Sequence, residues 1–361
     1  MDEGTIALET PTDGVFVPPS IHKSSTLSGD SYTHFSPVPA SLLPSTTTDS
    51  NSNSNSNSNN DSSSSSSSSS PKGVPCVLGV DEAGRGPVLG PMVYGVFYLP
   101  TTLSDSLLKE THHFDDSKVL TPAVRSDLMR TLCTAATDLA TSCGWAVSCL
   151  SARDIGARMQ RPATSAPYNL NAQALDATID LIRGVFDRGV HVTHIYVDTV
   201  GPPATHQAKL ARVFPSVNIT VAKKADSLYP CVSAASVCAK VTRDAALEVL
   251  YEARAEADLD SEATPTPAEP GWGSGYPSDA RCVTWLRRNM HPVFGWGPEC
   301  RFSWGTAKDM LETKGGVKVE WPVDEDDENT RLTTYFNATD KEKDADELGS
   351  WFGAPADLEA F

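Results

Sequence analysis

Three apolar segments of this sequence have the composition of buried β-strands, and each leads into carboxylates within a few residues. The acids that follow these segments are Asp81, Glu82, Asp198 and Asp226. A carboxylate at the end of a buried strand is costly unless a cation or hydrogen bonds compensate for its lost hydration. A single acid of this kind is most simply a helix cap or a solvated strand end, whereas the whole set favours a shared site. The pattern therefore predicts a sheet with a carboxylate-lined edge.

This set of acids fits a divalent-metal site. Mg²⁺ prefers hard oxygen ligands, retains several waters and takes phosphate oxygens as further ligands, and Mn²⁺ accepts the same ligands. Two such ions roughly 3.5–4 Å apart can activate a water and stabilise the departing oxygen of a phosphodiester. That mechanism needs no nucleophilic side chain, and the sequence shows none in an obvious setting. We therefore predict two bound ions, with all the acids named above as catalytic, metal-binding residues.

Hydrophobic patterning predicts an α/β fold with a mixed sheet flanked by helices. Strands are expected at residues 74–80, 92–99, 144–150, 192–197 and 217–221. Helices are expected at residues 121–140, 170–186, 205–213, 230–257, 278–289 and 306–313. Three strands in sequence, with helices and strands alternating after them, are typical of a mixed sheet. The last two helices predict a small helical C-terminal appendage.

Composition divides the chain into parts. Residues 1–72 include an Asn/Ser repeat followed by poly-Ser, which cannot bury a core, and we predict a disordered tail there. A catalytic domain is expected over residues 73–258, and a loop with a helical subdomain over residues 259–319. Residues 320–361 are acidic and poor in core residues, so they are expected to form a second tail.

The charge of the chain does not exclude a nucleic-acid partner. The formal net charge is −17, of which −6 falls in residues 1–70 and −10 in residues 320–361. The region between is therefore near neutral and can carry a basic groove for phosphate. No apolar run is long enough to span a membrane, and the amino terminus resembles neither a secretory signal nor a transit peptide. The cysteines form no Cys-x-x-Cys pair, which argues against zinc and for reduced thiols of an intracellular protein.

The glycine-rich turn after the first strand has two competing interpretations. A dinucleotide-binding fingerprint would need glycine where Leu89 stands, and Pro87 and Pro91 do not suit the helix that this motif must open. Glycines also let a backbone approach a sugar closely, because no Cβ intervenes. We therefore favour a sugar contact at Gly84 and Gly86, or a plain tight turn, over a dinucleotide site.

The turn carries a resemblance to a known family. The segment Asp-Glu-Ala-Gly-Arg-Gly-Pro-Val-Leu-Gly-Pro that begins at Asp81 resembles the signature of the type 2 ribonuclease H family, and most closely its eukaryotic catalytic subunit. Further matching stretches are Asp116–Lys118, Tyr168–Asn171, Val197–Gly201, Lys224–Lys240, Gly273–Pro277 and Arg301–Trp304. The likeness covers residues 74–312, whereas the poly-Ser tract lies outside it.

The resemblance implies a fold, an activity and partners. It implies a ribonuclease H-like sheet and the same carboxylates as metal ligands. It also implies hydrolysis of the RNA strand of RNA/DNA hybrids, and cutting 5′ to single ribonucleotides in duplex DNA, which leaves a 3′-hydroxyl and a 5′-phosphate. Family members of the eukaryotic type work with two non-catalytic subunits as a heterotrimer. Nuclear residence follows only from the implied role in genome maintenance.

An enzyme of this kind must recognise the ribose 2′-hydroxyl. The resemblance assigns this role to the backbone of the Gly84-Arg85-Gly86 turn, and it places Tyr276 against the sugar at the junction, although a tyrosine there could be a plain loop anchor. The side chains that we expect to contact phosphate are Lys118, Asn169, Thr199, Lys224, Lys240 and Arg243. Arg243 could instead pair with the neighbouring Asp244 or with Glu248.

Other functions remain open at this point. A two-metal nuclease of the same fold that acts on DNA alone would not need the glycine turn or Tyr276. A non-catalytic nucleic-acid-binding scaffold would not need the intact acids. The segment Arg331–Phe336 resembles a partner-docking segment of the family's catalytic subunits and, more loosely, a sliding-clamp motif.

Overall fold

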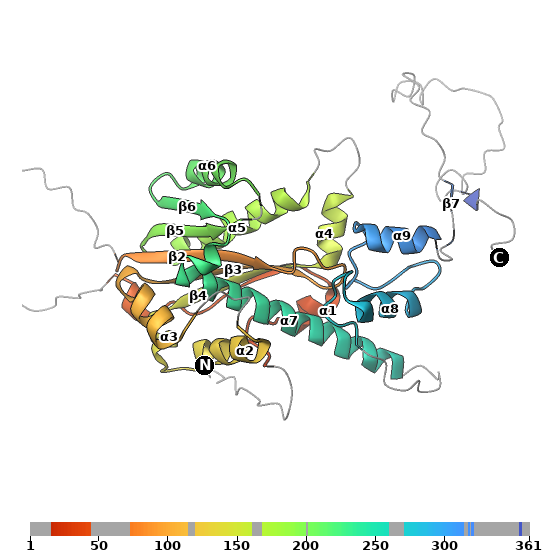
Figure 1. The fold of residues 1–361 in the computed structure, drawn as a ribbon, viewed down its shortest axis with the longest axis horizontal. Coiled ribbons are helices and arrows are strands. Elements are labelled where there is room, and N and C mark those ends of the chain that lie inside the picture. The colour runs from red at the N-terminus through yellow and green to blue at the C-terminus, as the bar shows by residue number, and fades with distance from the viewer. Residues whose placement is uncertain are drawn as a thin grey trace, which may run out of the picture.

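The structure is a computed structural model of the whole chain (Figure 1). It describes residues 16–44, 73–114, 120–160, 168–199, 201–259, 271–313, 317, 319–320 and 354–355.

The centre of the fold is a mixed, six-stranded sheet with the strand order β1-β4-β3-β2-β5-β6. The strands are β1 Tyr32–Phe35, β2 Cys76–Ala83, β3 Met92–Pro100, β4 Gly144–Leu150, β5 Val192–Asp198 and β6 Asn218–Ala222. β1, β4, β3 and β2 pair in antiparallel fashion, whereas β2, β5 and β6 run parallel. The predicted mixed sheet is therefore confirmed.

Helices cover both faces of this sheet. They are α1 Lys23–Ser28, α2 Pro122–Cys133, α3 Asp138–Ser142, α4 Ala152–Met159, α5 Leu170–Asp187, α6 Pro203–Val213, α7 Pro230–Leu259, α8 Ala280–Arg288 and α9 Gly305–Thr313. In Figure 1, α5 and α6 lie above the sheet, and α2, α3 and α7 lie below it. Each face has its own apolar core, so every residue of β3 and β4 is buried.

Shorter elements complete the described part of the chain. They are the 3-10 helices η1 Ala40–Leu42, η2 Thr101–Leu103 and η4 Ala225–Ser227, the π-helix η3 Ser104–Thr111, and the paired strands β7 Val319–Glu320 and β8 Ala354–Pro355. Among the described residues, we find no helix with the length and apolarity that a bilayer crossing requires.

The long helix α7 packs directly on the backbone of the strand that carries the first acids. A Cβ atom at Gly79 of β2 would lie 2.3 Å from the backbone of Cys231 in α7, so only glycine permits this approach. The α7 residues that follow are small and buried, among them Ala234, Ala235 and Ala239. This close packing fixes β2 relative to the helix that begins just after η4.

The predicted helical appendage has its own core. Trp272, Trp285 and Trp296 are buried there together with Leu286. The same cluster includes Val88 and Leu89, which come from the glycine-rich turn region after β2. The appendage is thus built onto that turn, and Figure 1 shows α8 and α9 at the end of the molecule beside α4.

The prediction that residues 1–72 are disordered is wrong for residues 16–44, which we call the N-terminal strap. β1 pairs with β4 as an edge strand, Leu42 is fully buried, and the Phe35 ring lies 3.5 Å under the guanidinium of Arg188. These few apolar anchors were hidden by the low-complexity composition that follows them. The Asn/Ser and poly-Ser tracts lie outside the described residues.

Two further differences concern the helices. The expected helix at residues 121–140, which lies between β3 and β4, is two helices separated by a turn in which Ala136 has a φ of 66°. Helix α4 and the π-helix η3 were not expected at all. The other helices and strands that were expected from the sequence lie within a few residues of their predicted positions.

Candidate active site

The ends of β2, β5 and β6 bring the predicted acids to one edge of the sheet. Val80 and Val197 are paired in the parallel ladder, so Asp81 and Asp198 leave the neighbouring strands β2 and β5 side by side. The turn after β6 is tied to the same place, because the amide of Ala225 donates to Asp198 Oδ1 over 2.8 Å. Asp226 is the next residue, in η4.

Burial and mutual repulsion act on these carboxyls. Asp81 is 6 % exposed and Asp226 is 4 % exposed. Burial raises the pKa of Asp81 well above its usual value, and the charges of Glu82 and Asp198 raise it further. Burial also raises the pKa of Glu82 to about 7, against the lowering effect of Arg85. A bound cation would relieve both the lost hydration and the repulsion.

These carboxylates suit a divalent ion whose remaining coordination positions are filled by the substrate. In the described part of the chain, no three His, Cys, Asp or Glu side chains converge as a ready-made cage for a single ion. Mg²⁺ is usually held by one or two carboxylates together with waters and substrate phosphate oxygens. The carboxylates at this edge therefore fit ions whose coordination is completed by the oxygens of a phosphodiester.

The glycine-rich turn lies directly after these acids. Gly84 has a φ of +77°, and a Cβ atom there would lie 2.6 Å from the carbonyl oxygen of Pro91. The Arg85 guanidinium donates to Asn171 Oδ1 at the start of α5. Gly86 is exposed, and a Cβ atom there would lie 3.2 Å from the ring of Tyr276. The turn thus presents bare backbone between the carboxylates and an aromatic ring.

The carbonyl groups of this turn accept hydrogen bonds from two side chains of the appendage. Arg301 is fully buried and donates to the carbonyls of Gly84 over 2.6 Å and of Arg85 over 3.1 Å. The Trp304 indole donates to the carbonyl of Gly86 over 3.0 Å. In a trans peptide the N–H points opposite to the C=O. The amides of Arg85 and Gly86 therefore face away from Arg301.

Sequence reasoning gave no role to Arg301 and Trp304. Both belong to a stretch that resembles the family, but nothing in their sequence neighbourhood relates them to a turn more than two hundred residues earlier. Burial lowers the pKa of Arg301 to about 9, which still leaves the guanidinium charged at neutral pH. It can therefore act as a permanent donor inside the protein.

The loop that carries Tyr276 is held by a network of hydrogen bonds. The carboxylate of Asp279 accepts from the amide of Ser274 over 3.0 Å, and the amide of Val88 donates to the carbonyl of Gly275 over 2.9 Å. Arg243 donates to the carbonyl of Ser274, and its guanidinium lies 5.8 Å from the centre of the Tyr276 ring. The loop is thereby fixed to the end of the glycine-rich turn and to α7.

The expectation that Arg243 contacts phosphate does not fit this placement. Arg243 is 5 % exposed, and its donors point to Ser274 and to Asp244, which was the alternative considered from the sequence. The charge is turned inwards because α7 runs beneath the Tyr276 loop at this point. Arg243 therefore supports the loop that carries Tyr276 and does not offer its charge at the surface.

The other expected phosphate contacts have mixed settings. Lys224 is exposed and has a φ of 57°, an unusual conformation for a lysine. Lys240 is partly exposed on α7, and Asn169 is exposed but caps α5 by accepting from the amide of Ala172 over 3.0 Å. Thr199 is largely buried and lies 3.3 Å from His206 Nδ1. Lys118 lies outside the described residues.

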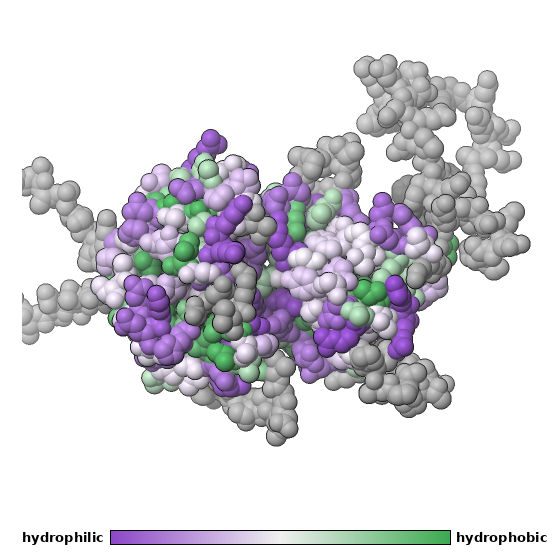
Figure 2. Space-filling model, viewed as in Figure 1, coloured by the Kyte–Doolittle hydropathy of each residue, from purple (hydrophilic) through white to green (hydrophobic). Residues whose placement is uncertain are grey.

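A cavity of about 220 Å³ opens next to the acids. The polar residues that line it are Glu82, Arg85, Tyr94, Asn171, Thr178, Asp198, Thr199, Thr205, His206 and Lys209. Lys209, His206 and Asn171 were not among the expected site residues, and only Asn171 lies in a stretch that resembles the family. Figure 2 shows a narrow hollow across the centre of this face, bordered by hydrophilic residues.

Comparisons with known proteins agree with this geometry. The family model described as Ribonuclease HII matches residues 78–307. The chain is 57% identical over 350 residues to a ribonuclease H2 subunit of Neurospora crassa, covering 96% of this chain and 98% of that protein. It is 43% identical over 265 residues to the Homo sapiens protein of the same name, covering 73% and 82% respectively. The crystal structure of ribonuclease H2 from Pyrococcus horikoshii OT3 matches with a TM-score of 0.51 and 28% identity, over 66% of this chain and 97% of that one.

Proposed function

The chain belongs to the ribonuclease HII family and is a ribonuclease H with the fold of that family, and on this premise we propose that it cuts 5′ to single ribonucleotides embedded in duplex DNA. We extend the proposal to the RNA strand of RNA/DNA hybrids. The products would be a 3′-hydroxyl and a 5′-phosphate. The proposal is supported by the position of the glycine-rich turn, which presents bare backbone directly after the carboxylates of β2.

The residues at the sheet edge support a metal-assisted hydrolysis. Asp81, Glu82, Asp198 and Asp226 would hold two divalent ions, with Mg²⁺ as the first choice and Mn²⁺ as a substitute. The ions would supply activation of the attacking water and stabilisation of the leaving oxygen. The protein's own contribution is to hold the carboxylates close together in a partly dry site, where a cation and a phosphate replace the missing hydration.

The observation that carries the proposed ribose specificity is the close approach of the Gly86 backbone to the Tyr276 ring, since a Cβ atom at Gly86 would lie 3.2 Å from that ring. The amides of Arg85 and Gly86 face away from Arg301, on the side where a 2′-hydroxyl could accept from them. The Tyr276 ring is 38 % exposed beside them, so it can pack against the next sugar. A nuclease that acts on DNA alone has no use for donors aimed at a hydroxyl that DNA lacks.

Contacts to phosphate would position the duplex without reading its bases. We retain Lys118, Asn169, Thr199, Lys224 and Lys240 for this role. Lys224 is exposed and stands two residues before Asp226 in the sequence. Its unusual backbone conformation is of the kind that clusters at functional sites.

A cleavage assay tests the proposal. A DNA duplex with one ribonucleotide and the same duplex in all-DNA form would be incubated with Mg²⁺ and the chain, alone and with the proteins that co-purify with it. We expect a cut 5′ to the ribonucleotide and an intact all-DNA control. Cutting of both duplexes would remove the ribose specificity, and cutting of neither in any sample would favour the non-catalytic scaffold.

The names of the relatives suggest an assembly. Because those proteins are each named as one subunit of ribonuclease H2, we propose that this chain works with two non-catalytic subunits in a heterotrimer. Nuclear residence is proposed only from the implied role in genome maintenance. The segment Arg331–Phe336, expected to dock on a partner or on a sliding clamp, lies outside the described residues. A sizing experiment on the protein purified from its host would test the heterotrimer.

A further inference from the structure

The N-terminal strap connects the sheet, the long helix and the appendage. The Ser20 hydroxyl forms a buried, 2.8 Å hydrogen bond with the hydroxyl of Thr242 on α7. Tyr32 begins the strand that pairs with β4, opposite Cys149. Arg153 of α4 donates to the carbonyl of Ser28 over 2.8 Å. Residues far from the acids in sequence are thus fastened to three separate elements.

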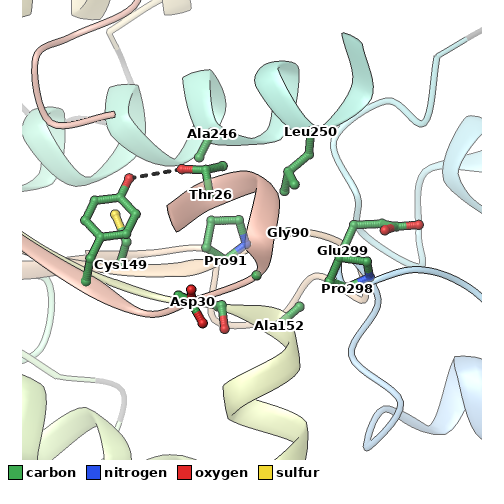
Figure 3. Close-up of a pocket in the computed structure, with 13 residues that line it drawn as sticks. Thr26, Asp30, Gly90, Pro91, Cys149, Ala152, Ala246, Leu250, Pro298 and Glu299 are labelled. Atoms are coloured by element: carbon green, nitrogen blue, oxygen red, sulfur yellow. Dashed lines mark hydrogen bonds between the residues drawn. The ribbon is translucent and has the colours of Figure 1, made fainter. Parts of the chain in front are cut away.

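The strap meets the appendage at Gly29. This residue ends α1 with a φ of 72°, and a Cβ atom there would lie 2.8 Å from the Cβ of Pro298. A proline Cβ cannot move away as the end of a flexible side chain can, because its ring ties it to the backbone. Figure 3 shows α1 passing close to Pro298 and Pro91.

Pro298 leads directly into the segment that holds the glycine-rich turn. The amide of Gly90 donates to the carbonyl of Glu299 over 2.8 Å, and the amide of Arg301 donates to the carbonyl of Val88 over 2.9 Å. The Arg301 side chain then reaches the carbonyls of the turn. The segment Pro298–Arg301 therefore lies between the strap on one side and the turn on the other.

There is little free volume at this junction. The cavity between the strap, α7 and the appendage measures about 20 Å³, enough for roughly one water. It is lined by Thr26, Gly90, Pro91, Ala246, Leu250 and Pro298, among others (Figure 3). Close-packed interiors transmit a displacement rather than absorb it. A shift of the strap would therefore reach the turn through Pro298.

We propose that the strap is a positioning element for recognition of the ribonucleotide. It packs the segment Pro298–Arg301 against the turn, so that Arg301 holds the carbonyls of Gly84 and Arg85 in one orientation. The N–H groups of the same two peptides, those of Arg85 and Gly86, then face the substrate. The matched family model begins at residue 78, so the strap lies outside it. The inference rests on the proposed cutting at ribonucleotides.

The test uses two glycines with the same backbone conformation. Gly29→Ala adds a Cβ where only 2.8 Å separates it from Pro298, whereas Gly189→Ala, at a φ of +83°, adds one that meets nothing nearer than 3.5 Å. Both substitutions carry the strain of a left-handed alanine, and only the first also displaces Pro298. Each variant would be assayed as the full chain with its co-purifying proteins, on the single-ribonucleotide duplex.

We expect Gly29→Ala to lower kcat roughly ten- to a hundredfold, as a small misplacement near the reacting group does, with KM for the duplex nearly unchanged. Gly189→Ala should stay within about twofold of the native rate at a temperature where circular dichroism shows all proteins folded. Replacing Pro298 with glycine in the Gly29→Ala background removes the clashing Cβ and should restore part of kcat.

Other outcomes distinguish a failure of the strap's positioning role from a failure of the proposed function. If the native protein cuts the duplex and Gly29→Ala matches it, or both alanine variants lose kcat equally, the strap has no positioning role. Failure of the second substitution at Pro298 to restore any activity would count against it as well. If the native protein itself cuts no ribonucleotide duplex, the proposed function fails and the strap inference fails with it.

Discussion

Arg301 and Gly84 are joined by a 2.6 Å hydrogen bond inside the protein, although 217 residues separate them in the sequence. The same guanidinium reaches the carbonyls of Arg85 and Gly90, so a single buried cation satisfies three carbonyls of the turn region. Because these bonds come from a planar, rigid group, they fix the orientation of the peptides as well as their position. The turn is therefore shaped by the appendage.

Arg301→Lys should consequently impair both stability and catalysis. Lysine keeps the charge but cannot reproduce the fork of donors, so buried carbonyls lose their partners at about 1–3 kcal/mol each. We expect a clear drop in the urea midpoint and a loss of kcat larger than that of Trp304→Phe, which removes one hydrogen bond. Equal kcat values for the two variants would show that the fork does not orient the turn.

The metal-ligand assignment predicts a separation of binding from cleavage. Asp226→Asn preserves the shape of the side chain but removes a charge, so we expect kcat to fall roughly a thousandfold, or about 4 kcal/mol in activation free energy. Duplex binding, measured by fluorescence anisotropy, should be nearly unchanged. Glu248→Gln, on the exposed part of α7, serves as the control and should cleave normally. Residual cleavage near the native rate in Asp226→Asn would contradict the assignment.

The position of the Tyr276 ring beside Gly86 predicts which atoms of the tyrosine matter. If the ring packs on a sugar, Tyr276→Phe should cut the single-ribonucleotide duplex almost as well as the native protein. Tyr276→Ala should lose roughly 10- to 100-fold in kcat/KM, because stacking and positioning are both removed. Gly86→Ala should show a smaller loss, since its Cβ would lie 3.2 Å from the ring. A large loss in Tyr276→Phe would instead assign the role to the hydroxyl.

The sequence predicted the sheet, and the placement of the acids at one edge of it, because both depend on local patterns. An apolar strand that leads into Asp81 or Asp198 is visible without knowledge of the rest of the chain. The strap was missed because its anchors depend on residues distant in the sequence, as Phe35 does when its ring lies against Arg188, more than a hundred residues later. The burial of Arg243 was missed for a related reason, since it depends on the loop that carries Ser274, which lies 31 residues later.

The raised pKa of Glu82 predicts how stability depends on pH. Its folded-state pKa of about 7 lies above its ordinary value of 4.5, so folding favours the protonated form. Without metal, this carboxyl should therefore cost stability progressively as the pH rises from about 4.5 to about 7. We expect Tm in EDTA to fall over that window more steeply for the native protein than for Glu82→Gln. Mg²⁺ should remove the difference for the native protein above pH 7, because it favours the ionised form. Parallel Tm curves for the two proteins in EDTA would refute this account.

The strap ends close to the start of the segment that leads into β2, which predicts that residues 45–72 between them can be removed. A Cβ atom at Gly73 would lie 2.5 Å from the carbonyl oxygen of Leu42 and 3.4 Å from Pro44, so the described residues on the two sides of residues 45–72 lie next to each other. Replacing residues 45–72 with a linker of a few residues leaves every described contact intact. It also shortens the closed loop about eightfold, which should favour folding by roughly 1–2 kcal/mol.

Thermal unfolding of this deletion should give a Tm at or above that of the native chain, together with an unchanged cleavage rate. Deletion of residues 16–44 is the matched control, and it should lower Tm strongly because it removes β1 and the buried Leu42. Such a contrast would place the stabilising contacts in the strap rather than in residues 45–72. A deletion of residues 45–72 that unfolds as readily as the strap deletion would mean that the tract itself supports the fold.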